Sequence, residues 1–131
     1  MSSNLKKSLF DAAFSHLKSG ETQKALELCV TGMDKYPDDP NIFCLTGQAL
    51  ITLKRFEDAR TLINSILKKF PKFANAQELH GDLLLLEGQF EKSVQVYESL
   101  QKLAPNRQHL IAKIERANDL TKSLISGESS E

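Results

Sequence analysis

Residues 37–71 read PDDPNIFCLTGQALITLKRFEDARTLINSILKKFP, and this stretch decides the fold. The stretch begins at Pro37 and ends at Pro71, 34 residues later, and Pro105 follows after another 34 residues. Two columns of the same register hold only small residues: Ala13, Gly47 and Gly81 in one, and Ala25, Ala59 and Ser93 in the other. A fixed period of about 20 to 50 residues indicates one supersecondary unit stacked on copies of itself.

Apolar residues recur three and four positions apart between breaking residues, which is the pattern of helices that bury one face. We expect helices over about residues 4–18, 22–35, 40–53, 56–69, 74–87, 90–103 and 107–124. The short connections between them force antiparallel pairs. Gly20 and Gly88 end the first helices of two units, where glycine adopts a left-handed conformation without steric cost. The remaining unit carries Lys54 in that place, so we expect a slightly strained turn there.

The repeated unit carries aromatic, small and proline positions at set spacings. In the second unit these positions are Phe43, Thr46, Gly47, Leu50, Phe56, Ala59, Ile63 and Pro71, and in the third Gln77, His80, Gly81, Leu84, Phe90, Ser93, Tyr97 and Pro105. In this pattern the chain resembles the tetratricopeptide repeat family from Leu5 to about Pro105. The resemblance implies an all-α fold, an α-solenoid of about seven helices whose antiparallel pairs wind into a right-handed superhelix.

The periodicity predicts a single array over residues 1–125. We place the repeats at about residues 6–39, 40–73 and 74–107, followed by a capping helix at about residues 107–124. One apolar stripe runs along that last helix, formed by Leu110, Ile111, Ile114, Ala117, Leu120 and Leu124. A repeat array needs such a cap to cover its last open apolar face. Residues 126–131 carry no packing side chain, and we expect a disordered tail there.

Composition argues against several functions. Lysine and arginine number 17, and so do aspartate and glutamate, so the net charge at pH 7 is zero. Because a polyanion or an anionic membrane surface attracts an excess of cations, we expect neither nucleic acid binding nor membrane insertion.

No apolar run approaches the ~18 residues of a membrane span, and the N-terminal residues do not form a secretory signal. Cys29 and Cys44 fall at apolar positions, and we expect buried thiols in a cytoplasmic protein.

The residues give no sign of catalysis. His16, His80 and His109 come from three separate predicted helices, and we expect the first two to be packed or capping side chains. The chain contains no HExxH or CxxC motif, no glycine-rich phosphate loop and no nucleophile elbow. We therefore expect no enzyme activity, no cofactor and no metal.

The family resemblance implies where a partner would bind, because in this family the first helix of each unit lines a concave groove that holds a peptide or helix. Those positions give a predicted partner-binding set of Phe10, Phe14, Cys44, Leu45, Gln48, Leu79, Asp82 and Arg116. Such a groove is apolar in its middle, and Asp82 or Arg116 would set the direction of the ligand. We expect a protein-interaction module, an adaptor or scaffold, that binds an amphipathic helix or an extended apolar segment.

One subfamily of co-chaperones holds the acidic C-terminus of heat-shock chaperones through lysines, asparagines and an arginine in its groove. The corresponding positions here are Phe10, Phe14, Leu45, Asn75 and Leu79, of which only Asn75 is polar. A carboxylate buried against leucine and phenylalanine would lose its water without gaining a partner. We therefore do not expect chaperone C-terminal acidic tails to bind.

Three other interpretations remain open from the sequence. The groove residues can be core filler covered by neighbouring helices, with Leu45 and Leu85 as the clearest candidates. The array can be the accessory domain of a larger enzyme, such as a glycosyltransferase or a sulfotransferase. The apolar groove of one copy can also receive a helix of another, which would make the protein a homo-oligomer.

Overall fold

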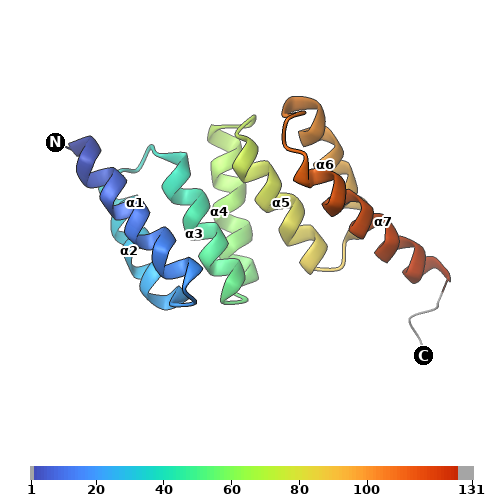
Figure 1. Cartoon of the computed structure of the whole chain (residues 1–131), viewed down its shortest axis with the longest axis horizontal. Helices are drawn as coiled ribbons and strands as arrows, with labels where there is room; N and C mark the ends of the chain where they lie inside the picture. The colour runs from blue at the N-terminus through green and yellow to red at the C-terminus, as the bar shows by residue number, and fades with distance from the viewer. Residues whose placement is uncertain (1, 127–131) are drawn as a thin grey trace. The chain divides into compact units, whose positions relative to one another are not determined.

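The computed structural model describes residues 2–126, and within them the chain forms seven α-helices and no β-strand (Figure 1). The helices are α1 (Ser2–Lys18), α2 (Thr22–Lys35), α3 (Pro40–Thr52), α4 (Phe56–Lys69), α5 (Ala74–Leu86), α6 (Phe90–Leu103) and α7 (His109–Ser126). They confirm the predicted all-α fold, and each predicted boundary lies within two residues of the observed one. The disordered tail was predicted from residue 126, but Ser126 is the last residue of α7, and the rest of the predicted tail, residues 127–131, lies outside the described residues.

The helices fall into two compact units, divided in the sequence between Phe73 and Ala74. The first unit contains α1 to α4, and the second contains α5 to α7. This division falls where the sequence places the boundary between the second and third repeats. The assignment of residues 1–125 to a single array remains a prediction.

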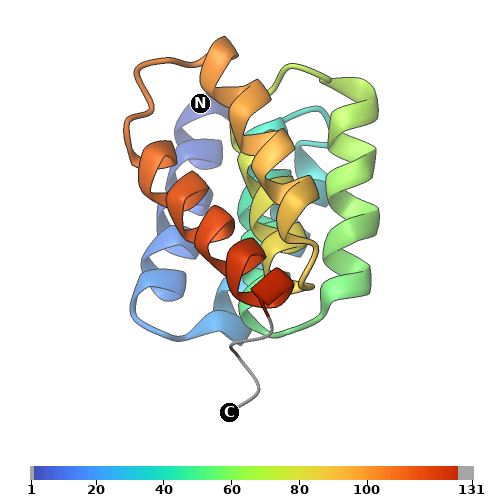
Figure 2. The ribbon, with the colours of Figure 1, turned by 90° about the vertical axis from the view of Figure 1, so that its right-hand side faces the viewer.

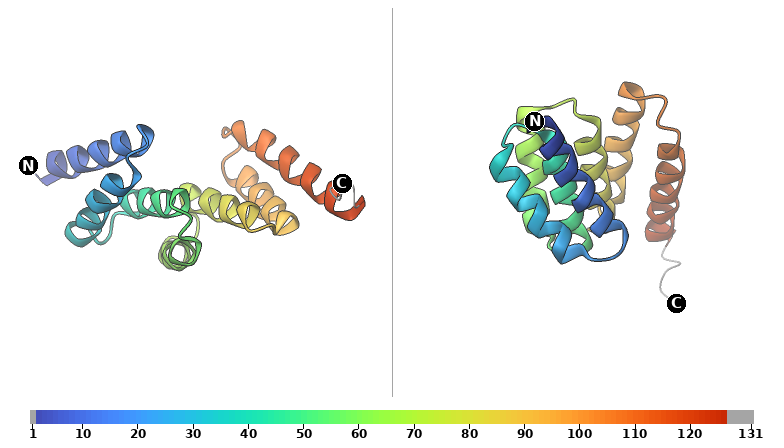
Figure 3. Two further views of the ribbon diagram at one scale, coloured as in Figure 1. Left: turned by 90° about the horizontal axis from the view of Figure 1, so that it is seen from below. Right: turned by 60° about the vertical axis from the view of Figure 1, so that its left-hand side comes forward.

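In the first unit each helix packs against the next, and α1 also touches α3. α1 and α2 form an antiparallel hairpin (Figure 3). A core cluster of Ala13, Cys29 and Leu45 joins the first three helices, and Phe10, Leu17 and Leu28 pack against it. The small-residue columns explain the close approach of paired helices, because Ala13, Ala25 and Ala59 have no exposed surface. A larger side chain at these positions would push the helices apart.

The turn inside each hairpin has the same backbone geometry in all three predicted repeats. Its central residue is Gly20, Lys54 or Gly88, with a φ angle of 87°, 62° or 82°. The Lys54 amide donates to the carbonyl of Ile51 at 2.9 Å, and the amides of Gly20 and Gly88 donate three residues back at 3.2 and 3.1 Å. Lysine therefore adopts the left-handed conformation that glycine adopts in the other two turns, as expected for a strained turn.

The start of α3 is capped by the side chain of Asp39. The Asp39 side chain accepts a hydrogen bond from the backbone amide of Asn41 at 2.9 Å, and Pro40 occupies the first turn, where its missing amide hydrogen costs nothing. The other carboxylate oxygen of Asp39 lies 3.2 Å from the ammonium of Lys6 on α1. The connection between α2 and α3 is thus tied to α1.

In the second unit α5 packs against α6, and α6 packs against α7, which lies beside it in Figure 2. The core cluster joins Tyr97, Leu100 and Leu110, with Ala74, Ala104 and Ile114 packed against it. The apolar stripe predicted along α7 is only partly buried, because Ile111 and Leu124 are 51% and 65% exposed. Ile111 follows the buried Leu110 by one residue, and one residue turns a side chain ~100° around a helix. Ile111 therefore points away from the core that Leu110 enters.

Candidate partner-binding site

Two phenylalanines of α1 form the aromatic part of the predicted site in the first unit. Phe10 is partly buried and packs against the core cluster of that unit. Phe14, one helical turn later, is 41% exposed. The two rings are stacked, with centroids 6.3 Å apart and an angle of 10° between their planes. Gln48 of α3, which belongs to the same predicted set, is exposed as well.

Cys44 and Leu45 are buried within the chain, which corrects the prediction that they contact a partner. Their exposed fractions are 6% and 5%. Because α3 packs against both α2 and α4 and also touches α1, most of its circumference is covered by neighbouring helices. Burial raises the pKa of the Cys44 thiol to about 12, which keeps it protonated and unreactive. Leu45 therefore fills the core, as the alternative interpretation holds.

Asp82 of α5 is held by two donors from its own unit. The Tyr97 hydroxyl on α6 donates to it at 2.5 Å, and the Lys113 ammonium on α7 donates to it at 2.8 Å. Its negative charge is thus matched inside the chain, which argues against a role for Asp82 in orienting a ligand. Leu79, close to one turn earlier on α5, is partly exposed, and Arg116 of α7 is exposed.

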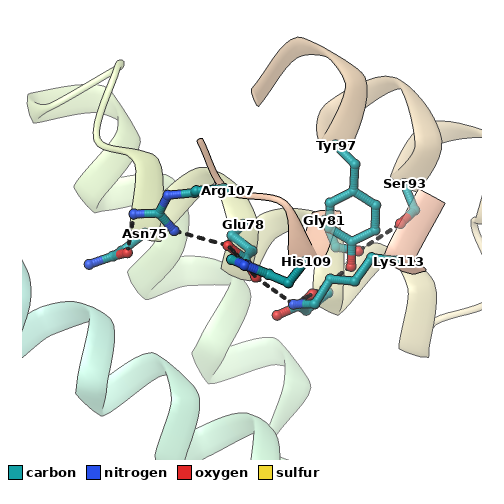
Figure 4. A network of polar contacts seen from close by, with 9 residues as sticks. Asn75, Glu78, Gly81, Ser93, Tyr97, Arg107, His109 and Lys113 are labelled. Carbon is teal, nitrogen blue, oxygen red and sulfur yellow. Dashed lines mark hydrogen bonds and ion pairs between the residues drawn. The ribbon is translucent and has the colours of Figure 1, made fainter. Parts of the chain in front are cut away.

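Glu78 of α5 gathers three side chains from α7 and the turn before it (Figure 4). Arg107 Nη1 donates to its carboxylate at 3.0 Å, Lys113 Nζ donates at 2.6 Å, and His109 Nε2 lies 2.9 Å away. Arg107 Nη2 also donates to Asn75 Oδ1 at 2.8 Å. Burial alone would raise the pKa of Glu78, but the hydrogen bonds from Lys113 and His109 outweigh it and lower the pKa. The network ties α7 to α5 within the second unit.

The same contacts determine the ionisation of Lys113 and Tyr97. Burial alone would lower the pKa of Lys113, but its hydrogen bonds to Asp82 and Glu78 outweigh burial and raise the pKa. The pKa of Tyr97 is raised by burial and by the hydrogen bond to Asp82. All of these shifts move ionisation away from pH 7. At pH 7 the network therefore links three helices with Glu78 ionised, Lys113 protonated and Tyr97 neutral.

This network was not predicted from the sequence. Glu78 and Asp82 stand four residues apart, which places both carboxylates on one face of α5, and this spacing was the only local signal. The lysine that joins them belongs to α7, which was predicted as an apolar cap with Arg116 facing a partner. Nothing in the local pattern indicates which helix its polar side chains reach.

A second feature of the first unit is an open hollow of about 360 Å³ between α2, α3 and α4. The apolar residues that line it are Leu26, Val30, Met33, Leu50 and Leu62, and the polar ones are Thr46, Arg55, Asp58, Thr61 and Ser65. Arg55 and Asp58 form an ion pair at 2.9 Å, so the rim carries no net charge. The lining contains neither a histidine nor a cysteine for catalysis.

The histidines and cysteines are dispersed over the structure. His16 Nδ1 lies 2.9 Å from a carboxylate oxygen of Glu21 at the end of α1, and burial lowers the pKa of the half-buried His80. Cys29 and Cys44 are buried free thiols, as predicted. Over the part of the chain that the structure describes, no three histidine, cysteine or acidic side chains are grouped so that they could hold a metal ion. Within that part, no helix combines the length and apolarity of a membrane span.

Helical hairpins with small residues at their crossings and a left-handed turn inside each hairpin define a helical repeat protein. The sequence profile of the tetratricopeptide repeat family matches residues 16–83, just over half of the chain. The chain belongs to the tetratricopeptide repeat family and is a protein-interaction module. No curated protein matches the sequence.

Solved structures share this fold over most of the chain. The first tetratricopeptide domain of Spaghetti (RPAP3), bound to the HSP90 peptide SRMEEVD, is 20% identical with a TM-score of 0.78, and the match covers 90% of this chain and 94% of that one. The Sgt2 domain from Aspergillus fumigatus is 15% identical with a TM-score of 0.82, and the match covers 94% and 83%. A mutant O-GlcNAc transferase of Thermobaculum terrenum is 20% identical with a TM-score of 0.80, where 88% of this chain matches 22% of the transferase.

Proposed function

We propose that the first unit binds an apolar segment of a partner protein on the first helices of its two hairpins, α1 and α3. The observation that carries the proposal is Phe14, a large aromatic side chain that is 41% exposed on α1. Its ring stacks on Phe10, which packs against the core, so the exposed ring is already ordered before a partner arrives. An ordered aromatic side chain loses little entropy on binding, and a few such anchors carry most of the energy of an interface.

Three further residues belong to the proposed surface. Gln48 is exposed on α3, which touches α1, and its amide supplies a polar contact at the edge of the apolar area. In the second unit we propose a separate contact through the partly exposed Leu79, with Arg116 as an exposed cation. The proposed partner is a protein and not a nucleic acid, because the chain has no net positive charge to attract phosphates.

We propose that chaperone C-terminal tails are not among the partners. Spaghetti (RPAP3) binds the HSP90 peptide SRMEEVD, which is rich in carboxylates. At the positions where a clamp for such a tail would lie, this chain has Phe10, Phe14 and Leu45, and Leu45 is buried. Asn75, the one polar residue of that set, already accepts a hydrogen bond from Arg107. We expect no binding of SRMEEVD that depends on its free C-terminus: in fluorescence anisotropy titrations the peptide and its C-terminal amide should give the same result, and tighter binding of the free acid would contradict this part of the proposal.

The main test is selection from a displayed library of random peptides without a free C-terminus, carried out on the full chain. The selected peptides are then measured with the Phe14→Ala chain and with the Leu103→Ala chain, whose leucine is 51% exposed on α6 and serves as the matched control. We expect Phe14→Ala to weaken binding about tenfold or more and Leu103→Ala to leave it unchanged. Equal losses in the two variants, or no peptide that depends on Phe14, would overturn the proposal.

A further inference from the structure

A lysine lies beside the exposed phenylalanine of α1. Phe10, Phe14 and Lys18 follow one another at intervals of four residues, so they lie along one side of the helix. The Lys18 ammonium lies over the Phe14 ring, 5.3 Å from its centroid, and Phe10 stacks on the same ring. This side of α1 therefore carries an aromatic contact area with a single positive charge at its C-terminal end.

Lys18 differs from the other lysines of α1 because it has no acidic partner among residues 2–126, which the structure describes. Lys6 pairs with Asp39 at 3.2 Å, and Lys7 pairs with Asp11 at 2.9 Å. Among the residues that the structure describes, no carboxylate lies within ion-pair distance of the Lys18 ammonium. Its charge is therefore available to a group from outside the chain.

The nearest carboxylate in the sequence, Glu21, is already occupied by other donors. One of its oxygens lies 2.9 Å from His16 Nδ1 and accepts a hydrogen bond from Ser19 at 3.2 Å, and the other accepts from Lys24 at 3.2 Å. The hydrogen bond with His16 is the largest of the effects that lower the pKa of Glu21 to about 2. The turn after α1 thus holds Glu21 away from Lys18.

We propose that Phe14 and Lys18 together select a partner segment in which an apolar side chain lies close to a side-chain carboxylate. The apolar side chain contacts the Phe14 ring, and the carboxylate pairs with the Lys18 ammonium. This inference rests on the proposed function and names the charge that gives the ligand its direction. A charged pair of this kind at the edge of an apolar contact contributes mainly to specificity and to the rate of association.

A single-stranded nucleic acid is the alternative ligand for an aromatic ring beside a lysine, since bases stack on aromatic faces and phosphates bind lysine. Two observations favour the protein segment. The chain has no net charge, so it lacks the excess of cations that holds a polyanion. The Lys18 ammonium also lies over the face of the Phe14 ring, which a base would have to displace in order to stack there.

The test repeats the peptide selection with a Lys18→Glu chain and a Lys102→Glu chain. Lys102 lies in the last turn of α6 as Lys18 lies in the last turn of α1, so both substitutions lose the same attraction to a helix C-terminus. We expect peptides selected on the unaltered chain to carry Asp or Glu close to an apolar residue. We expect Lys18→Glu to weaken their binding about tenfold or more and to select Lys or Arg instead, while Lys102→Glu keeps the original preference.

Each outcome of this experiment bears on the inference. Peptides that depend on Phe14 but show no acidic preference would overturn it and leave the proposed function intact, whereas a lack of Phe14-dependent peptides would overturn both. Equal effects of Lys18→Glu and Lys102→Glu would also overturn it, because they would indicate a general charge effect. If single-stranded DNA binds more tightly than the selected peptides, and Phe14→Ala abolishes that binding, the surface would be assigned to nucleic acid. A Lys18→Met chain, which keeps the aliphatic stem, replaces Lys18→Glu if the latter loses its helical circular dichroism.

Discussion

The ring of Tyr97 on α6 lies across the place where a side chain of Gly81 on α5 would be. A Cβ atom at Gly81 would lie 2.5 Å from Tyr97 Cε1, which is closer than real carbon atoms approach. The Gly81 carbonyl accepts a hydrogen bond from the Ser93 hydroxyl at 2.9 Å (Figure 4). The missing side chain lets two helices pack closely, and the fully buried tyrosine reaches an acceptor in Asp82.

This contact predicts that Gly81→Ala destabilises the protein. Alanine is a better helix former than glycine by about 1 kcal/mol, so helix propensity alone favours the substitution. A net loss of stability would therefore come from the contact with the Tyr97 ring. Because the fully buried ring of Tyr97 would have to shift, we expect a loss of about 1–3 kcal/mol in the free energy of unfolding. Urea denaturation followed by circular dichroism measures it, and a variant as stable as the unaltered chain would show that the ring moves aside at no cost.

The three equivalent turns predict opposite effects of exchanging glycine and a larger residue. Lys54 has a φ angle of 62°, a conformation that costs a residue with a Cβ atom about 1–2 kcal/mol. Glycine at this position would remove that cost, but the larger conformational entropy that glycine loses on folding offsets part of the gain. We therefore expect Lys54→Gly to stabilise the protein by about 0.5–1 kcal/mol. Gly88→Ala, whose Cβ would meet no atom within 4 Å, should destabilise it by about 1 kcal/mol through the same backbone term. Thermal unfolding of both variants checks the pair, and changes of the same sign would contradict it.

Two adjacent residues of α7 predict very different effects on stability. Leu110 is fully buried in the cluster with Tyr97 and Leu100, whereas Ile111 is 51% exposed. We expect Leu110→Ala to cost about 2–5 kcal/mol, because it removes transfer energy and leaves a cavity. Ile111→Ala should change the free energy of unfolding by less than about 0.5 kcal/mol, as is usual for exposed positions. Denaturant midpoints of the two variants test whether α7 covers the core of the second unit as the structure has it.

The Glu78 network predicts a pH-dependent contribution to stability. The pKa of Glu78 is lower in the folded chain than its ordinary value of 4.5, so its contribution is present above that pH and is lost as the pH falls through the folded pKa. We expect Glu78→Gln to cost about 1–3 kcal/mol at pH 7, because three donors lose a charged acceptor. The difference in melting temperature between the two chains should shrink below pH 4.5. A difference that is the same at pH 7 and at strongly acid pH would rule out the ionised network as its source.

The helices, their boundaries and the left-handed turns were predictable because they depend on short stretches of chain. The 34-residue register placed small residues in the columns where helices cross, and these residues are buried there, as at Ala25, Ala59 and Ser93. Glycine at two turns predicted the conformation of the third, although Lys54 occupies it. Apolar spacing also predicted the burial of Cys29 and Cys44.

The predicted partner-binding set stays a prediction, and the exposure of its residues depends on what neighbouring helices cover. Phe14 and Gln48 are exposed as a binding surface requires, whereas Cys44 and Leu45 lie in the core. Phe14, Cys44 and Leu45 are all apolar, and the helical pattern of the sequence does not distinguish an apolar residue that faces a partner from one that faces a second helix.

The sequence by itself determined the repeat, the helices and the family, because sterics and hydrophobic periodicity act within a few residues and recur every 34. Only the tertiary structure decided which charges are matched. Asp82 is held by Tyr97 and Lys113, which lie 15 and 31 residues away in the sequence. Within the described part of the chain Lys18 has no such partner, since Glu21 is held by other donors in the turn after α1. Ion pairing depends on distances of a few ångströms in space, and for residues far apart in the sequence those distances arise only when separate helices are packed together.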